Sequence, residues 1–95
     1  MSVVVIVNIE SKPERSLEAL EIIKKSQEIC LSMDGCTGFE VLQHQDDKHK
    51  FSFIERWDST EIHQAFIDQL MGNEEFIERM EVFTSGPQIE YFDKV

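Results

Sequence analysis

The chain has 95 residues, 41% of them hydrophobic, among which are seven Phe, one Trp and one Tyr. That length suits one domain spanning residues 1–95, and the apolar content can form a core without disulfides or a structural metal. Nine Lys and Arg against nineteen Asp and Glu give a formal net charge of -10. Such a charge repels phosphate backbones and anionic lipid head groups, so neither nucleic acid nor a membrane is expected as a partner.

The sequence carries no sign of export. It has no run of eighteen apolar residues, and its first ten residues lack the basic leader that precedes a secretory segment. The two cysteines, Cys30 and Cys36, are a poor basis for a disulfide framework. We therefore expect a cytoplasmic protein with both thiols reduced.

Strand and helix patterns alternate along the first half of the chain. Residues 3–10, VVVIVNIE, are β-branched almost throughout and predict a strand. Ser11 and Glu14 form an S-x-x-E capping box, so a helix is expected to begin there and to end at Asp34-Gly35. Residues 39–45 and 50–57 alternate in polarity around a polar turn, which predicts a β-hairpin.

The second half repeats the helix and strand signals. A D-x-x-E pattern from Asp58 to Glu61 predicts a second helical region, which Met71-Gly72-Asn73 should break and Gly86-Pro87 should end. Residues 88–95 then predict a last strand. The resulting order β-α-β-β-α-β is typical of the α+β ferredoxin-like fold, a four-stranded antiparallel sheet with both helices on one face.

The first strand is apolar on both faces, with Val3, Val5, Val7 and Ile9 on one and Val4, Ile6 and Asn8 on the other. Helices on one side of the sheet can cover only one of these faces. We therefore expect a homodimer that forms through the open sheet face. The alternative is that the first strand is an apolar edge strand and needs no partner.

Five short signals occur in register along the chain. They are the β-branched first strand, Lys12-Pro13 at the helix entry, the Asp34-Gly35-Cys36 turn, the E-x-W-x-S stretch from Glu55 to Ser59, and Ser85-Gly86-Pro87 before the last strand. Together they resemble the antibiotic biosynthesis monooxygenase family, whose members are dimeric α/β barrels with a ferredoxin-like fold. The resemblance implies a pocket in each subunit between the helices and the sheet, where several members oxygenate small aromatic substrates with O₂ and without metal or flavin.

The resemblance also bears on site residues. In the polyketide-quinone branch a Trp on the third strand is accompanied by an Asn four residues earlier and by an aromatic or polar group six residues later. Here these positions hold Trp57, Phe53 and His63, so the Trp matches and the Asn is missing. In the haem-degrading branch a first-strand Asn accompanies a helical Trp and an iron-binding His. Asn8 fits the first, but Phe66 replaces the Trp and no His follows His63, so haem is disfavoured.

Three residues are candidates for catalysis. His63 has the best intrinsic pKa for a base, Asn8 is an amide in an apolar strand, and Trp57 can stack on a flat ligand. The other interpretations are a solvent-facing histidine, an amide satisfied by backbone, and a tryptophan that closes the core. The candidates for the pocket wall are Phe39, Phe53, Glu55, Phe66 and Tyr91.

Glu55 shares strand parity with Phe51, Phe53 and Trp57, which places a carboxylate on an aromatic face where desolvation would raise its pKa. Pairing with a Lys or Arg is the alternative. His44 and His49 lie across the predicted turn near Asp46 and suggest a metal, but an exposed hairpin tip explains them equally well. No nucleotide, hydrolase or zinc motif occurs.

These observations predict a cofactor-independent monooxygenase, an oxidoreductase that needs O₂ as co-substrate and no metal or organic cofactor. Its substrate would be a small phenolic, quinol-type or polyketide-like molecule. Two alternatives remain open: an isomerase or lyase of a small oxygenated metabolite, and a dimer that binds a small ligand without catalysis.

Overall fold

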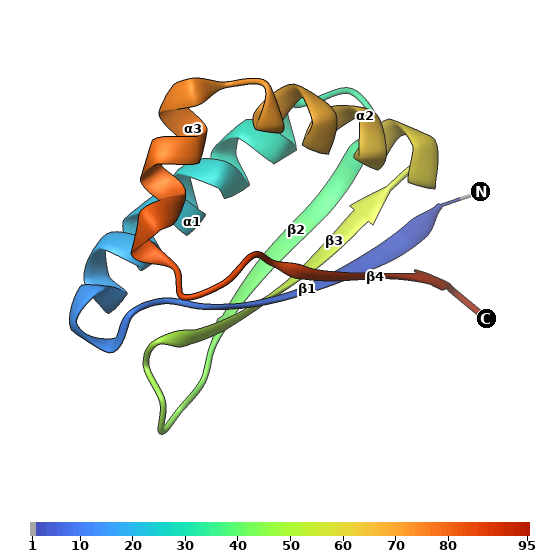
Figure 1. Cartoon of the computed structure of the whole chain (residues 1–95). Helices are drawn as coiled ribbons and strands as arrows, with labels where there is room; N and C mark the ends of the chain where they lie inside the picture. Colours follow the sequence, from blue (N-terminus) through green and yellow to red (C-terminus); the bar gives the residue numbers. More distant parts are fainter. Residues whose placement is uncertain (1) are drawn as a thin grey trace.

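The structure, a computed structural model, describes residues 2–95. Its four strands are β1 (Val3–Glu10), β2 (Cys36–Gln43), β3 (Lys50–Trp57) and β4 (Gln88–Asp93). Its helices are α1 (Ser16–Ser32), α2 (Thr60–Met71) and α3 (Glu74–Arg79), with short 3-10 turns η1 (Pro13–Arg15) and η2 (Met80–Val82). Figure 1 shows all the helices on one side of the sheet. The α+β ferredoxin-like fold predicted from the sequence is confirmed, with the second helical region split in two.

The four strands form one antiparallel sheet in the order β2-β3-β1-β4. β1 is therefore an inner strand that pairs with β3 on one side and β4 on the other. The alternative in which the apolar first strand lies at the edge of the sheet is wrong. The helices cover the face that carries Val3, Val5, Val7 and Ile9, while Val4 and Ile6 on the other face are only half-buried in the single chain.

The core lies between the sheet and the helices. Along β1 the residues Val3, Val5, Val7 and Ile9 are buried, and along β3 the same holds for every second residue from Phe51 to Trp57. α1 contributes Ala19, Ile23 and Cys30, and α2 contributes His63 and Phe66. The period of two along the strands thus assigns Glu55 to the helix-covered face, as its parity predicted.

Both helix starts differ in detail from the capping patterns predicted. Ser11 is fully buried, forms an isolated bridge with Phe83 and donates its hydroxyl to the carbonyl of Lys12, so it does not cap a helix. The chain instead passes through η1 before α1 begins. At α2 the cap is Ser59, whose hydroxyl accepts the N–H of Ile62, and Asp58 lies one residue outside. The predicted break after Met71 is confirmed, with Asn73 capping α3 through the N–H of Phe76.

The hairpin between β2 and β3 starts three residues earlier than predicted, at Cys36, and β2 ends at Gln43. At its tip Nδ1 of His44 accepts the backbone N–H groups of Asp46 and Asp47, at 3.1 and 3.0 Å. Among residues 2–95 no group of three or more His, Cys, Asp and Glu side chains gathers closely enough to hold a metal ion. His44 therefore shapes the turn.

The face of the sheet opposite the helices is open in the single chain. Reading across β2, β3, β1 and β4, its central row is Glu40, Ile54, Ile6 and Glu90. The flanking rows are Gly38, Arg56, Val4 and Phe92 on one side, and Leu42, Ser52, Asn8 and Gln88 on the other. The open face thus has an apolar centre with charged and amide groups around it, and is less uniformly apolar than β1 alone indicated.

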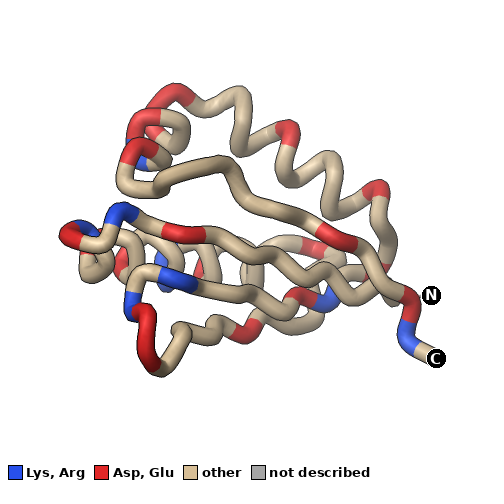
Figure 2. Tube along the Cα trace, turned by 60° about the horizontal axis from the view of Figure 1, so that its bottom comes forward, with Lys and Arg blue, Asp and Glu red and all other residues tan. Residues whose placement is uncertain are grey.

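Charge is unevenly distributed over the fold. Figure 2 shows the acidic residues along the helices and at the hairpin tip, while most of the length of the strands is uncharged. No helix within residues 2–95 is both long enough and apolar enough to cross a membrane.

Gly35, between α1 and β2, adopts a φ of +97°, and a Cβ built on it would lie 2.9 Å from Cγ2 of Ile62 at the start of α2. The positive φ and the short distance to Ile62 both make a side chain at this position unfavourable. We expect Gly35→Ala to lower the free energy of unfolding by about 1–3 kcal/mol in urea titrations. Gly86→Ala is the matched control, because a Cβ at Gly86 meets nothing within 4 Å. Equal stability of the two variants would contradict this account of the turn.

Candidate functional site

Three titratable groups lie close together on the helix-covered face: two in one row of the sheet and one on α2. In the sheet register Glu55 of β3 pairs with Val5 of β1, and Val5 pairs with Tyr91 of β4. Glu55 and Tyr91 therefore lie on the same face, separated by one small and fully buried residue. His63, one turn into α2, reaches both of them from above.

The contacts form a short chain through the core. Nε1 of Trp57 donates a hydrogen bond of 2.8 Å to Oε1 of Glu55. The same oxygen lies 3.7 Å from Nε2 of His63. The other ring nitrogen, Nδ1, lies 2.8 Å from the hydroxyl of Tyr91. We call Trp57, Glu55, His63 and Tyr91 the polar relay.

Aromatic rings enclose this relay. The His63 ring packs edge-on against Trp57 and Tyr91, with centroids at 5.3 and 5.4 Å, and Trp57 also packs against Phe66 at 5.4 Å. Trp57 is fully buried and His63 is 1% exposed, whereas Tyr91 is 36% exposed. The relay therefore runs from the interior to the surface at β4.

Burial shifts both members of the central pair away from their charged forms. Desolvation raises the pKa of Glu55, although the hydrogen bond from Trp57 to the carboxylate opposes the shift. Desolvation likewise lowers the pKa of His63. The distance between them would suit an ion pair, but both shifts favour a neutral imidazole beside a carboxyl group that holds its proton to higher pH than usual.

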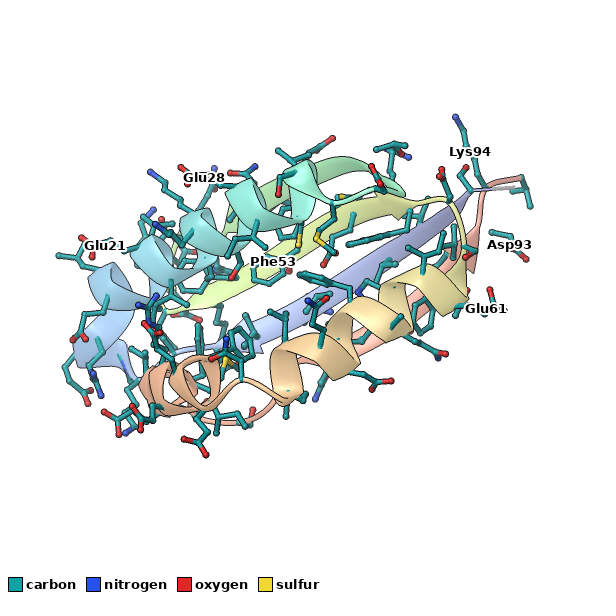
Figure 3. All side chains as sticks on the ribbon, turned by 90° about the horizontal axis from the view of Figure 1, so that it is seen from above. Glu21, Glu28, Phe53, Glu61, Asp93 and Lys94 are labelled. Carbon is teal, nitrogen blue, oxygen red and sulfur yellow. The ribbon has the colours of Figure 1, made fainter. Side chains whose placement is uncertain are left out.

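A cavity of about 90 Å³ adjoins the pair, between the sheet, α1 and the α2–α3 arm. Glu55 and His63 are the titratable groups of its wall apart from the thiol of Cys30. The rest of the lining is apolar, except for Ser26, and includes Phe39, Phe53 and Phe66. In Figure 3 Phe53 lies between the two helical arms, while Glu21, Glu28 and Glu61 point away from the space between them. These three labelled glutamates thus stay outside the pocket, and Glu55 is the acidic side chain of its lining.

The structure brings most of the predicted site residues together. Phe39, Phe53, Glu55, His63 and Phe66 line the cavity. Tyr91 and Trp57 contact His63 from either side, and Trp57 serves as a buried support behind the cavity. The alternative of a solvent-facing His63 is wrong, because α2 turns it toward the sheet. The alternative of Glu55 paired with Lys or Arg is also wrong, because its partners are Trp57 and His63.

Asn8 does not belong to this group. It lies on the open face of the sheet, is exposed, and accepts a hydrogen bond of 2.6 Å from the hydroxyl of Ser52. Strand alternation explains this, since Asn8 follows the parity of Val4 and Ile6 and not that of Val5 and Val7. The prediction that Asn8 and His63 face one pocket within a chain is therefore wrong.

Asn8 instead borders a second hollow of about 460 Å³, on the open face near the hairpin. Ser52, Gln88 and Leu42 adjoin it in the same row. Its titratable side chains, Glu10, His44 and Lys50, are not buried. Although this hollow is larger, it lacks the desolvated acid–base pair that marks the cavity under the helices.

Sequence reasoning placed Tyr91 in the pocket wall but missed its bond to His63. The two residues are separated by 28 positions, and only the register of β4 against β1 brings the hydroxyl under α2. Strand alternation could have indicated that Tyr91 lies under the helices. Tyr91 and Ile89 are two positions apart on β4, so both point to the helix-covered face.

The thiols take no part in the relay. Cys30 lines the cavity but burial raises its pKa far above the ordinary value, and burial also raises the pKa of Cys36. Both therefore stay protonated near neutral pH and are poor nucleophiles.

The raised pKa of Glu55 predicts a pH dependence of stability. Between the ordinary value of 4.5 and the higher folded value, the folded chain retains a proton that the unfolded chain releases. The free energy of unfolding should therefore fall as the pH rises through that window. His63 acts oppositely: its stabilising contribution is present above pH 6.5 and is lost as the pH falls through its lowered folded pKa.

Glu55→Gln removes the first of these effects. Relative to the parent chain, its free energy of unfolding should increase as the pH rises from 4.5 through the raised folded pKa of Glu55, and should level off above that pKa. Urea unfolding at a series of pH values measures this difference. A difference that stays constant with pH would show that Glu55 titrates alike in the folded and unfolded chains.

Taken together, the sheet and its helical cover define a ferredoxin-like α+β domain with a largely apolar pocket between helices and sheet. The sequence match is more specific. Residues 2–83 match the antibiotic biosynthesis monooxygenase family, and the chain belongs to that family.

Solved structures with the same fold cover almost the whole chain. A candidate antibiotic biosynthesis monooxygenase from Deinococcus radiodurans has a TM-score of 0.81 at 15% identity, covering 98% of this chain and 92% of its own. One from Bordetella bronchiseptica has a TM-score of 0.79 at 18% identity, covering 99% and 97%. One from Nitrosomonas europaea has a TM-score of 0.80 at 15% identity, covering 99% and 90%. No curated protein sequence matches the chain.

Proposed function

We propose that this chain is a cofactor-independent monooxygenase that oxidises a small phenol or quinol in the cavity beneath the helices. The observation that carries the proposal is the pair of Glu55 and His63, desolvated at the wall of an otherwise apolar and aromatic cavity. Membership of the antibiotic biosynthesis monooxygenase family supports the reaction class.

The chemistry explains why such a pair is useful. A singlet organic molecule reacts slowly with triplet O₂ until it can give up an electron, and deprotonating a phenolic hydroxyl makes that transfer easier. The protein then supplies a base, a dry pocket and hydrogen-bond donors near the developing charge. One oxygen atom enters the substrate and the other leaves as water, with both hydrogens of that water coming from the substrate. No metal or flavin is needed for this balance.

The cavity restricts the size of the substrate. Its volume of about 90 Å³ is smaller than the roughly 150 Å³ cavity that holds benzene in an engineered protein. The pocket is partly open to solvent, so a single ring fits when it extends toward the mouth or when wall side chains such as Met80, which is flexible and only partly buried, shift. These dimensions favour a one-ring phenol or hydroquinone over a polycyclic polyketide.

We also propose that the protein works as a homodimer joined through the open sheet face. Val4, Ile6 and Ile54 form the apolar centre of that face, and Leu42 and Phe92 are 49% and 44% exposed beside it. A second copy related by a twofold axis would cover these side chains. Arg56 and the flanking Glu40 and Glu90 then lie where they can pair across the interface.

Oxygen-dependent conversion tests the proposed reaction. The protein, treated with chelator and freed of flavin, is mixed with a substituted hydroquinone in an oxygen electrode and product is followed by chromatography. We expect O₂ consumption and product formation well above the rate without protein, and neither under argon. Conversion that requires an added metal or flavin would contradict the proposal.

The same acid–base pair also favours a second candidate, an isomerase or lyase that moves a proton within a small oxygenated metabolite. Proton transfer between carbon and oxygen needs only the Glu55–His63 pair and the largely apolar cavity beside it. Turnover of such a metabolite at equal rates in air and under argon would favour this candidate. Tight retention of a phenol without any conversion would instead favour a ligand-binding dimer.

A further inference from the structure

The two members of the buried pair are not equally free to act. Both nitrogens of His63 face protein groups, Nδ1 toward Tyr91 at 2.8 Å and Nε2 toward Glu55 at 3.7 Å. Only the contact with Tyr91 is within hydrogen-bond distance, so Nδ1 is occupied, whereas Nε2 makes no hydrogen bond within residues 2–95. His63 could therefore accept a substrate proton only on Nε2, and only in the tautomer that carries its own proton on Nδ1.

Glu55 is arranged differently. Its Oε1 accepts from Trp57 and faces His63, whereas Oε2 makes no hydrogen bond to any residue within 2–95. Every fully enclosed side-chain nitrogen or oxygen in that part of the chain does have a partner. Oε2 therefore keeps accessible surface, and because Glu55 lines the cavity and is only 4% exposed, that surface faces the cavity. A carboxylate oxygen with free lone pairs is thus available to a ligand there.

The surrounding groups favour this orientation. Trp57 can only donate, so its N–H holds Oε1. A tyrosine hydroxyl that donates to Nδ1 leaves the proton of a neutral imidazole on Nε2, where it points toward the same Oε1. Two N–H groups then face Oε1, one hydrogen-bonded and one at longer range, and Oε2 is left for the substrate. Cys30 and Cys36 are the other titratable groups near this carboxylate, and both are protonated thiols.

We propose that Glu55 is the general base, accepting the hydroxyl proton of the substrate on Oε2, and that Tyr91 is a positioning residue that fixes His63 as the Nε2–H tautomer behind it. This inference rests on the proposed function for its substrate class. The proton leaves the substrate oxygen for the carboxylate, which becomes a carboxylic acid, and the electron pair stays on the substrate as phenolate. The raised pKa of Glu55 makes its ionised form a stronger base than an exposed carboxylate.

Ligand titrations test the role of Glu55 without any turnover. The protein with ¹³C-labelled glutamate carboxyls is titrated with pH by NMR, alone and saturated with 4-fluorophenol or with 4-fluoroanisole, which lacks the hydroxyl proton. We expect the phenol to lower the pKa of Glu55, because an O–H donor stabilises the carboxylate. The ether should not lower it, and exposed Glu40 should respond to neither. An equal response to both ligands, or none to the phenol, would overturn the assignment.

Tautomer analysis tests the role of Tyr91. The ¹⁵N shifts of His63 should show Nε2–H and a bare Nδ1 in the parent chain, and Tyr91→Phe should lose this preference while Glu55 still responds to the phenol. An Nδ1–H tautomer in the parent chain would overturn the positioning role. A phenol that binds and shifts Glu55 without O₂-dependent conversion would refute the monooxygenase proposal and leave this inference standing.

Discussion

Glu55→Gln should lower the O₂-dependent turnover of a hydroquinone by about 100-fold or more, the range typical of losing a general base. Gln retains an oxygen for Trp57 and nearly the same shape, so the fold and the cavity should persist. His63→Gln should cost less, about tenfold, because it removes an orienting group and leaves the carboxylate in place. Steady-state rates with matched circular dichroism spectra measure both effects.

Glu21→Gln is the control for charge. Glu21 lies on α1, is exposed and points away from the space between the helices (Figure 3), so removing its carboxylate changes the net charge equally without touching the cavity or the open sheet face. We expect its turnover to match the parent. Near-parent activity of both Glu55→Gln and His63→Gln would remove the relay from the mechanism.

Ile54→Asp should convert the protein from a dimer into a monomer. Ile54 lies in the central row of the open face between Glu40 and Ile6. In the proposed dimer an aspartate there would be buried without a partner, at a cost of several kcal/mol. Light scattering at micromolar concentration should report a mass near 11.1 kDa for the variant and twice that for the parent.

Leu17→Asp provides the matched control. Leu17 is 78% exposed on α1, on the other side of the molecule from the open face. Like Ile54→Asp, this substitution replaces an aliphatic side chain with a carboxylate. The variant should remain a dimer. A parent chain that scatters as a monomer would contradict the proposed interface directly.

Periodicity along the chain was enough to predict the fold. The alternation of β3 placed Phe51, Phe53, Glu55 and Trp57 on one face, and the structure buries all four. Helix caps were predicted less well, because the residues that satisfy the first N–H groups depend on the approach of the preceding loop. Ser11, drawn into a bridge with Phe83, shows how a tertiary contact displaces a local pattern.

The site was predicted in composition but not in arrangement. Aromatic residues and a histidine near Trp57 were visible in the sequence, as was the placement of Glu55 among them. Asn8 was wrongly predicted to share a pocket with Phe53. Asn8 pairs with Ser52 on the open face of the sheet, whereas Phe53 pairs with Val7 on the helix-covered face. The bond between Tyr91 and His63 depends on the pairing of β4 with β1, which no local pattern specifies.

The most direct measurement is a structure of the protein with bound 4-fluorophenol. We expect the ring in the cavity among Phe39, Phe53 and Phe66, with its hydroxyl about 3 Å from Glu55. A ring bound instead on the open face against Asn8 and Ser52, with the cavity beneath the helices left empty, would contradict it.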